Sequence, residues 1–205
     1  MKIKIIDYKA GNSSSVMHAV ERIGFNAEYA KKPEDLIDST HIILPGVGTA
    51  KATMQSLEET GLLPALQDAV INKKIPYLGI CIGMQIVFEY SEEGDAECLG
   101  WLKGKVVKFD SSTVRVPQMG WNYVKFIKKT NIQANDGYYY FVNSYHAQPQ
   151  NKEDIWATAE YGKIFTAAVN RENIFGAQFH VEKSGEQGLK LLKSFLTLKG
   201  GANAD

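Results

Sequence analysis

The residues Tyr77-Leu78-Gly79-Ile80-Cys81-Ile82-Gly83-Met84-Gln85 change from an apolar, strand-like run to a helix-like pattern at Cys81. Glycines stand two positions before and two positions after the cysteine, which is the form of a nucleophile elbow with sulfur in place of oxygen. Such a sharp turn leaves no room for side chains at the glycines. It also exposes the sulfur at a helix N-terminus, where a thiolate is favoured. The alternative interpretation is a small cysteine buried between two core elements.

Strand-like and helix-like segments alternate around this turn and on its N-terminal side. The strands are predicted at Lys2–Asp7, Phe25–Tyr29, His41–Leu44 and Tyr77–Ile80. The helices are predicted at Ser13–Ile23, at Ala50–Asn72 with a break near Gly61, and from Cys81 through Tyr90, and a glycine-containing turn is expected at 8–12. This alternation predicts an α/β fold, in which a parallel sheet is covered by helices on both faces and carries its site at the carboxyl ends of the strands.

Beyond Gly94 the strand-like segments follow one another closely and are expected to be antiparallel or mixed. They are predicted at Gly104–Phe109, Tyr123–Ile127, Tyr138–Val142, Ile155–Tyr161, Ile164–Val169 and Ile174–Phe179. An amphipathic helix over Ser184–Leu198 completes the pattern. We therefore expect one domain over 1–198, a three-layer sandwich around a mixed, mostly parallel sheet, and a flexible tail over 199–205.

Composition limits the classes of protein that the chain can be. Of its 205 residues, 44% are hydrophobic and 11% aromatic, which fits a compact domain and excludes a disordered or collagen-like chain. Lys plus Arg and Asp plus Glu both number 23, so the charge footprint of a nucleic-acid or membrane binder is missing. Without an apolar run of membrane-span length or a signal peptide pattern, we expect a cytoplasmic protein, with neither cofactor nor metal.

A cysteine nucleophile needs a base, and the sequence contains four histidines. His180 follows the strand-like run 174–179, and Glu182 stands two positions later, so in extended backbone both side chains point to one side. The carboxylate can then hold one imidazole nitrogen while the other faces the thiol. An ordinary surface pair of His180 and Glu182 is the alternative.

The other histidines fit this role less well. His18 falls inside a helical pattern and His41 opens an apolar strand, so both are interpreted as structural. His146 is the rival base, but it has no carboxylate at comparable spacing. The sequence therefore favours a Cys81-His180-Glu182 triad.

An acyl-transfer site also needs hydrogen-bond donors for the oxyanion of its tetrahedral intermediate. Pro45-Gly46-Val47-Gly48 follows the strand His41–Leu44, and its glycines allow a peptide N–H to turn inward. We expect backbone donors from Val47 and Gly48, together with the N–H of Ile82. A simple strand-to-helix turn is the alternative, and the spacing does not match a dinucleotide-binding fingerprint.

Taken together, these residues resemble the triad-type (class I) glutamine amidotransferases, and within them the glutaminase subunits of imidazole glycerol phosphate synthase. The resemblance covers nearly the whole chain. The motifs that carry it, in the family's order, are Pro45-Gly46-Val47-Gly48, Gly79-Ile80-Cys81-Ile82-Gly83-Met84-Gln85, Met119-Gly120-Trp121-Asn122, Tyr140-Phe141-Val142 with Ser144-Tyr145, and Gly176-Ala177-Gln178-Phe179-His180 with Glu182-Lys183-Ser184.

The resemblance implies a reaction and a partner. Cys81 would attack the carboxamide of glutamine to form a thioester, His180 would protonate the departing ammonia, and Glu182 would orient His180. Four residues fall on the family positions that hold glutamine: Gln85, Glu93, Ser144 and Tyr145. The ammonia would pass to a (β/α)₈ barrel synthase subunit in a heterodimer that serves histidine biosynthesis.

Four positions depart from the family's usual pattern. Thr49, Gln118 and Asn143 stand where histidines are common, and Val181 replaces a proline between the catalytic histidine and glutamate. The triad itself is intact. These departures leave open a paralogue that supplies ammonia for an amidino sugar of a surface polysaccharide. A stand-alone thiol hydrolase and an inactive regulatory subunit are the alternatives outside this class.

Overall fold

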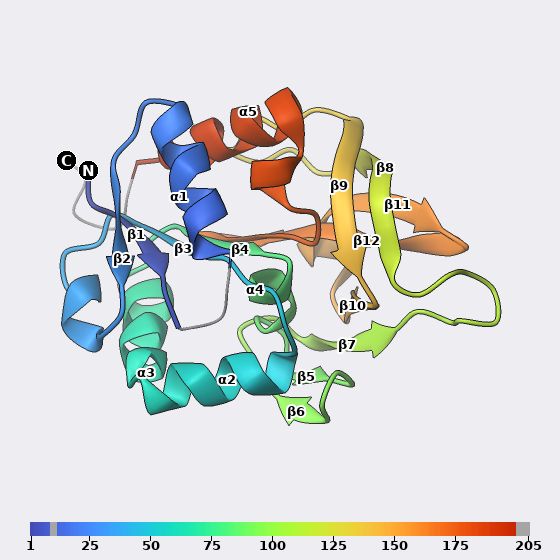
Figure 1. Cartoon of the computed structure of the whole chain (residues 1–205), viewed down its shortest axis with the longest axis horizontal. Coiled ribbons are helices and arrows are strands. Elements are labelled where there is room, and N and C mark those ends of the chain that lie inside the picture. The colour runs from blue at the N-terminus through green and yellow to red at the C-terminus, as the bar shows by residue number, and fades with distance from the viewer. Residues whose placement is uncertain (9–11, 200–205) are drawn as a thin grey trace.

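The computed structural model describes residues 1–8 and 12–199, which form three layers (Figure 1). The helices are α1 Ser13–Arg22, α2 Ala50–Glu59, α3 Leu62–Gln67, α4 Ile82–Gln85 and α5 Gly185–Leu196. The strands are β1 Ile3–Ile6, β2 Ala27–Ala30, β3 His41–Leu44, β4 Tyr77–Ile80, β5 Tyr90–Ser91, β6 Ala96–Glu97, β7 Gly104–Lys108, β8 Gln118–Phe126, β9 Gly137–Asn143, β10 Tyr145–Pro149, β11 Ile155–Tyr161, β12 Lys163–Arg171 and β13 Ile174–Ala177. Short helical turns of other types lie at Pro33–Leu36, Asp68–Asn72, Lys152–Asp154 and Val181–Lys183.

All the strands belong to one mixed sheet, whose main path is β2-β1-β3-β4-β13-β12-β10-β7-β5-β6. The run from β2 to β13 is parallel, and β12 then pairs antiparallel with β13. Helices α1 and α5 cover one face of the parallel part, and α2 and α3 cover the other (Figure 1). This arrangement confirms the predicted α/β fold with a mixed sheet.

The parallel strands are apolar on both faces because helices cover both faces. Ile5 and Ile43 pack in the cluster that includes residues of α1 and α5, whereas Ile6, Ile42 and Leu44 pack in the cluster that includes residues of α2 and α3. Successive residues of a strand point to opposite faces, so each strand feeds both cores. The uninterrupted apolar runs in the sequence follow from this double burial.

The order β3-β4-β13 brings together three segments that are far apart in the sequence. Leu44 is in register with Gly79, and Ile80 with Ala177, so all three strands end at one edge of the sheet. The segments that follow them are 45–48, Cys81 and 178–182. This edge is where ligands bind in parallel α/β sheets.

The turn after β4 is as sharp as its glycines predict. Cys81 has φ 55° and ψ −106°, a strained conformation for a residue with a side chain. A Cβ on Gly79 would lie 2.2 Å from the carbonyl oxygen of Gly83, and a Cβ on Gly83 would lie 2.0 Å from the carbonyl oxygen of Leu44. Both positions therefore require glycine, because the neighbouring backbone atoms could move aside only at a large cost in free energy.

We expect Gly79→Ala to lower the free energy of unfolding by about 3 kcal/mol or more, because its methyl group would overlap the Gly83 carbonyl. Chemical denaturation of the variant and the wild type measures this difference. Gly137→Ala is the matched control, since the nearest atom to its Cβ position is 3.8 Å away. Equal losses of stability in the two variants would contradict the close packing of the elbow.

The helix predicted from Cys81 through Tyr90 is wrong in its extent, because α4 ends at Gln85. The carbonyl oxygens of Ile86, Val87 and Phe88 accept hydrogen bonds from the N–H groups of residues 99, 102 and 100, respectively. Those carbonyls are thus paired with a distant segment instead of the next helical turn. Tyr90 belongs to the short strand β5.

The predicted strands also differ from the observed ones in several places. Strand β8 begins at Gln118, five residues before the predicted start, because Gln118–Val124 pairs with β9 along its whole length. Strand β10 was not predicted, since Tyr145–Pro149 carries a histidine and a proline, and its five register pairs with β7 define it. The last strand ends at Ala177, two residues early, and a 3-10 turn at Val181–Lys183 follows.

Some expectations fall on residues whose structure is not described. These are most of the predicted turn at 8–12 and all but the first residue of the predicted tail at 199–205. Among residues 1–8 and 12–199, no helix is long and apolar enough to cross a membrane.

Candidate active site

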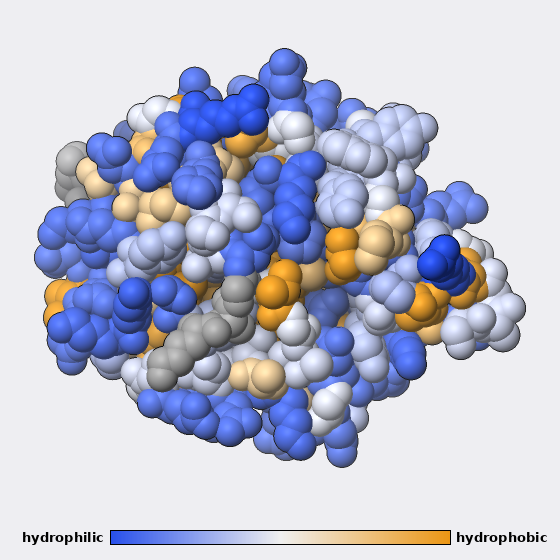
Figure 2. Space-filling view, in the orientation of Figure 1, coloured by the Kyte–Doolittle hydropathy of each residue, from blue (hydrophilic) through white to orange (hydrophobic). Residues whose placement is uncertain are grey.

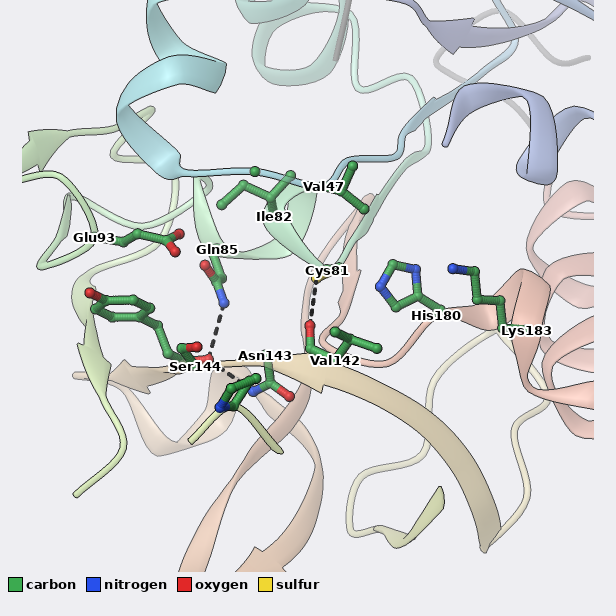
Figure 3. Close-up of a pocket in the computed structure, with 13 residues that line it drawn as sticks. Val47, Cys81, Ile82, Gln85, Glu93, Val142, Asn143, Ser144, His180 and Lys183 are labelled. Carbon is green, nitrogen blue, oxygen red and sulfur yellow. Dashed lines mark hydrogen bonds between the residues drawn. The ribbon is translucent and has the colours of Figure 1, made fainter. Parts of the chain in front are cut away.

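A cavity of about 290 Å³ opens at the carboxyl ends of β3, β4 and β13. Every predicted site residue except Glu182 lines it, and Glu182 lies behind His180, to which it is hydrogen-bonded. The lining residues are Val47, Gly48, Cys81, Ile82, Gln85, Glu93, Pro117, Val142, Asn143, Ser144, Tyr145, His180 and Lys183. Figure 3 shows their side chains arranged around Cys81. The cavity is of the size that holds a small molecule.

Cys81 lies at the floor of the cavity and is 8% exposed. Its backbone N–H donates to the carbonyl oxygen of Ala177 at 2.8 Å, which ties the elbow to the end of β13. Its thiol donates to the carbonyl oxygen of Val142 at 3.8 Å, as the dashed line in Figure 3 shows. The sulfur therefore has a fixed position at the surface of the cavity.

His180 and Glu182 form a buried pair, with side chains 2% and 1% exposed. The distance from Nδ1 of His180 to Oε1 of Glu182 is 2.8 Å. The same carboxylate oxygen accepts a hydrogen bond from Nδ2 of Asn12 at 2.6 Å. The sequence predicts extended backbone here, but Glu182 lies in the 3-10 turn that starts after His180. The pair forms nevertheless, because the turn folds the carboxylate back onto the ring.

The surroundings of His180 favour its protonated form. Burial by itself lowers the pKa of His180, but its interactions with Cys81, its hydrogen bond to Glu182 and the charges of these two groups outweigh burial and raise the pKa to about 9. For Glu182, burial raises the pKa, but the hydrogen bond and charge of His180 outweigh this and lower it overall. These surroundings favour an imidazolium next to the carboxylate when the sulfur of Cys81 carries a negative charge.

The other histidines lie in different surroundings. His41 is buried against Phe195 and its Nε2 lies 3.1 Å from the carbonyl oxygen of Leu198. His146 is 2% exposed, lies within β10 and contacts the ring of Phe109. Neither lines the cavity. His18 lies on α1, as its helical pattern predicts, and it is exposed.

The turn after β3 lies over the elbow. Val47 and Gly48 line the cavity together with Ile82, and Gly48 has φ 117°. A Cβ on Gly46 would lie 2.1 Å from both Cγ2 of Ile82 and the hydroxyl of Tyr8, so only glycine allows this close approach. Ile82 is the first residue of α4, and the N–H groups of a first helical turn have no helical carbonyl to bind. All three residues line the cavity together with Cys81.

The wall opposite this turn is polar and comes from α4 and the β9–β10 connection. Nε2 of Gln85 donates to the carbonyl oxygen of Tyr145 at 3.1 Å, and Nδ2 of Asn143 donates to the same oxygen at 2.9 Å. Glu93 lies at the far end of the cavity in Figure 3, and burial raises the pKa of its carboxyl group. Ser144 lines the cavity beside them. The wall therefore offers hydrogen-bonding groups and an acidic side chain.

Sequence reasoning missed several residues of the site. Asn12 was placed only in a turn, although it holds the carboxylate of Glu182 from a position 170 residues away. Gln178 was quoted within a motif without a role, although its Nε2 lies 3.7 Å from the sulfur of Cys81. Lys183 and Pro117 also line the cavity. Only their proximity to the recognised motifs in the sequence could have pointed to them.

The departures from the family pattern have local structural roles. Thr49 caps α2, since its hydroxyl accepts a hydrogen bond from the N–H of Ala52 at 3.2 Å. Gln118 and Asn143 are a buried cross-strand pair of β8 and β9. Val181 is fully buried in the core cluster that also contains Cys81. In the described ranges 1–8 and 12–199, no group of three or more His, Cys, Asp or Glu side chains is placed to hold a metal ion.

Comparison with known proteins identifies the family. Residues 4–198 match the family model described as glutamine amidotransferase class-I. The chain is 42% identical to the imidazole glycerol phosphate synthase subunit HisH of Leptospira interrogans over 203 residues, covering 96% of this chain and 100% of the relative. It is 43% identical to HisH 2 of Methanococcus maripaludis over 198 residues, covering 95% and 98%.

Solved structures agree on the fold. A crystal structure of a glutamine amidotransferase, 17% identical, superposes with a TM-score of 0.76 over 95% of this chain and 96% of the other. The family match spans both the elbow of Cys81 and the His180–Glu182 turn. This chain belongs to the class-I glutamine amidotransferases.

Proposed function

We propose that this protein is the glutaminase subunit of an imidazole glycerol phosphate synthase, which hydrolyses glutamine and delivers the ammonia to a (β/α)₈ barrel partner in histidine biosynthesis. The observation that carries the proposal is the buried His180–Glu182 pair beside Cys81 in one cavity, in a chain that matches HisH proteins over almost its full length. We place the reaction in the cytoplasm.

In the proposed reaction, the thiol of Cys81 passes its proton to His180, and the resulting thiolate attacks the carboxamide carbon of glutamine. His180, whose raised pKa keeps it protonated, gives its proton to the leaving nitrogen, so that neutral ammonia departs and a thioester remains. Water then attacks the thioester and transfers a proton back to His180, and the sulfur leaves as glutamate forms. Glu182 holds the ring in place throughout.

The backbone of Val47, Gly48 and Ile82 is proposed to stabilise the oxyanion of both tetrahedral intermediates, because all three line the cavity beside the sulfur. Gln85, Glu93, Ser144 and Tyr145 are proposed to hold the rest of the glutamine. The carboxylate of Glu93 suits the α-ammonium group of the substrate. No cofactor or metal is needed for this chemistry.

A surface near the cavity is suited to a protein partner. Strand β8 presents Met119, Trp121 and Tyr123 outward, at 67%, 56% and 48% exposure, and Tyr138 of β9 packs against Tyr123. A Cβ on Gly185 would lie 3.9 Å from the ring of Trp121, so this ring is close to the backbone two residues after Lys183 of the cavity lining. Figure 2 shows further apolar residues, in orange, across the middle of a mostly hydrophilic face. Aromatic residues of this kind dominate the energetics of interfaces.

The proposal is tested by measuring glutamine hydrolysis with and without the barrel subunit of imidazole glycerol phosphate synthase and its acceptor. We expect activity to rise by at least about 10-fold on adding both, and Trp121→Ala to weaken the stimulation. Full activity of the chain alone would instead identify a stand-alone thiol hydrolase. Stimulation only by a barrel synthase that aminates a sugar would identify the paralogue. No activity under any condition would identify an inactive regulatory subunit.

A further inference from the structure

Two buried side-chain amides connect the sulfur of Cys81 to the wall of the cavity. Nε2 of Gln178 donates to Sγ of Cys81 at 3.7 Å, and Oε1 of Gln178 accepts from Nε2 of Gln85 at 3.0 Å. Nε2 of Gln85 also donates to the carbonyl oxygen of Tyr145. Gln178 is fully buried and Gln85 is 3% exposed, so protein groups set the orientation of both amides.

The carbonyl of Tyr145 determines which atoms donate and which accept in this chain of hydrogen bonds, which we call the relay. A carbonyl oxygen only accepts hydrogen bonds, so Gln85 must turn its nitrogen toward Tyr145. The second proton of that nitrogen points to Gln178, which must therefore present its oxygen. The amide nitrogen of Gln178 is then left to face the sulfur. Exchanging the positions of the oxygen and nitrogen in either amide would place two hydrogen-bond donors or two acceptors face to face in a buried site, which costs free energy.

Asn143 reinforces this direction. Its Nδ2 donates to the same carbonyl oxygen of Tyr145, so two amide groups share the two lone pairs of that oxygen. Because both protons on Nε2 of Gln85 are used within the protein, Gln85 offers the substrate its oxygen. The group it meets on glutamine must therefore be a donor, either the ammonium or the carboxamide NH₂.

These hydrogen bonds also affect whether the sulfur of Cys81 keeps its proton. Gln178 supplies an N–H donor, whereas the contact with the Val142 carbonyl requires the sulfur to keep its proton. Loss of the proton therefore strengthens the first contact and weakens the second. Resting on the proposed glutaminase function, we propose that Gln178 is a positioning residue, which holds the sulfur of Cys81 as a hydrogen-bond acceptor and fixes Gln85 with its oxygen toward the substrate.

Two substitutions of similar length test this proposal. Gln178→Met removes the donor without adding charge. Gln178→Glu keeps an oxygen to accept from Gln85 but places a carboxylate beside the sulfur. The readout is the pH dependence of Cys81 alkylation by iodoacetamide in the full chain, followed by peptide mass spectrometry. Cys98 is an internal reference in every sample, because burial raises its pKa to about 11.

We expect the midpoint of Cys81 alkylation to move upward by about 1 pH unit in Gln178→Met, and further in Gln178→Glu. An unchanged midpoint in both variants would overturn the proposal. A shift in Gln178→Glu alone would also overturn it, because any buried negative charge would act on the sulfur in that way. If Gln178→Glu does not fold, Gln178→Met decides alone. The matched control is Gln148→Glu, on the exposed side of β10, which should leave the midpoint unchanged.

Steady-state kinetics with the partner complex separate the two proposed tasks of Gln178, which are donating to the sulfur of Cys81 and fixing the orientation of Gln85. Gln178→Glu should lower kcat by about 10-fold or more with little change in the KM for glutamine, because Gln85 keeps its acceptor. Gln178→Met should change both constants. The alkylation experiment needs neither glutamine nor a partner, so it remains decisive for Gln178 even if the chain is not a glutaminase.

Discussion

Cys81→Ala is expected to abolish glutamine hydrolysis, with a loss of more than about 10⁴-fold in kcat, because no other group can form the thioester. The same variant in complex with the barrel subunit should still make product when ammonium salts replace glutamine. This follows from the proposed function, in which the sulfur releases ammonia and the partner uses it. Both rates are measured by following glutamate release and acceptor consumption.

The substitution should leave the fold intact. Cys81 lies at the floor of the cavity, and its backbone bond to Ala177 does not involve the side chain. Thermal unfolding of the variant provides the check, and Cys98→Ala is the matched control because Cys98 lies outside the cavity lining. Glutaminase activity that persists in Cys81→Ala would remove this residue from its proposed role.

Glu182→Gln is expected to lower the pKa of His180 from its value of about 9, since the hydrogen bond and charge of Glu182 are among the causes that raise it against the effect of burial. We expect kcat to fall by about 10² to 10⁴-fold, less than in Cys81→Ala, because orientation is impaired while the nucleophile remains. Nuclear magnetic resonance titration of the imidazole ring measures the pKa directly. His41, whose pKa burial lowers to about 4, is the internal reference.

The same variant tests the coupling of this pair to stability. A histidine with a raised folded-state pKa adds stability that is complete below its unfolded value of 6.5 and is lost as the pH rises through about 9. The stability difference between wild type and Glu182→Gln should therefore shrink over that range. Glu186→Gln, an exposed change on the adjacent helix, is the control. A pH-independent difference would show that the charge of the pair is unimportant.

The sequence predicted the parallel part of the fold well because physical constraints there are local. His41–Leu44 and Tyr77–Ile80 match β3 and β4 to the residue, since a strand buried on both faces must be apolar throughout. The helix after Cys81 was predicted too long, because Ile86, Val87 and Phe88 continue the apolar pattern while their carbonyls bind residues 99–102. Long-range pairing of this kind leaves no local signal.

The candidate site shows the same difference between features with a local sequence signal and features that depend on long-range contacts. Spacing and chemistry predicted Cys81, His180 and Glu182 as site residues, and the structure places them together. The turn at Val47 and Gly48 was predicted from its place after a strand. The hydrogen-bonding partners of Glu182 and Cys81 were not predicted. Asn12 and Gln178 are brought to them by the tertiary fold, and neither residue lies in a distinctive local sequence pattern. The contact of His180 with Glu182 was expected from alternation along a strand, yet a 3-10 turn makes it.

The central claim is that the sulfur of Cys81 is the nucleophile that attacks glutamine. The most direct test is to incubate this chain, together with the proposed barrel partner, with a reactive-ketone analogue of glutamine, and to locate the added mass by peptide mass spectrometry. We expect one adduct per chain, on Cys81, which excess glutamine prevents. An unmodified Cys81, or an adduct on Cys98 that glutamine does not prevent, would contradict it.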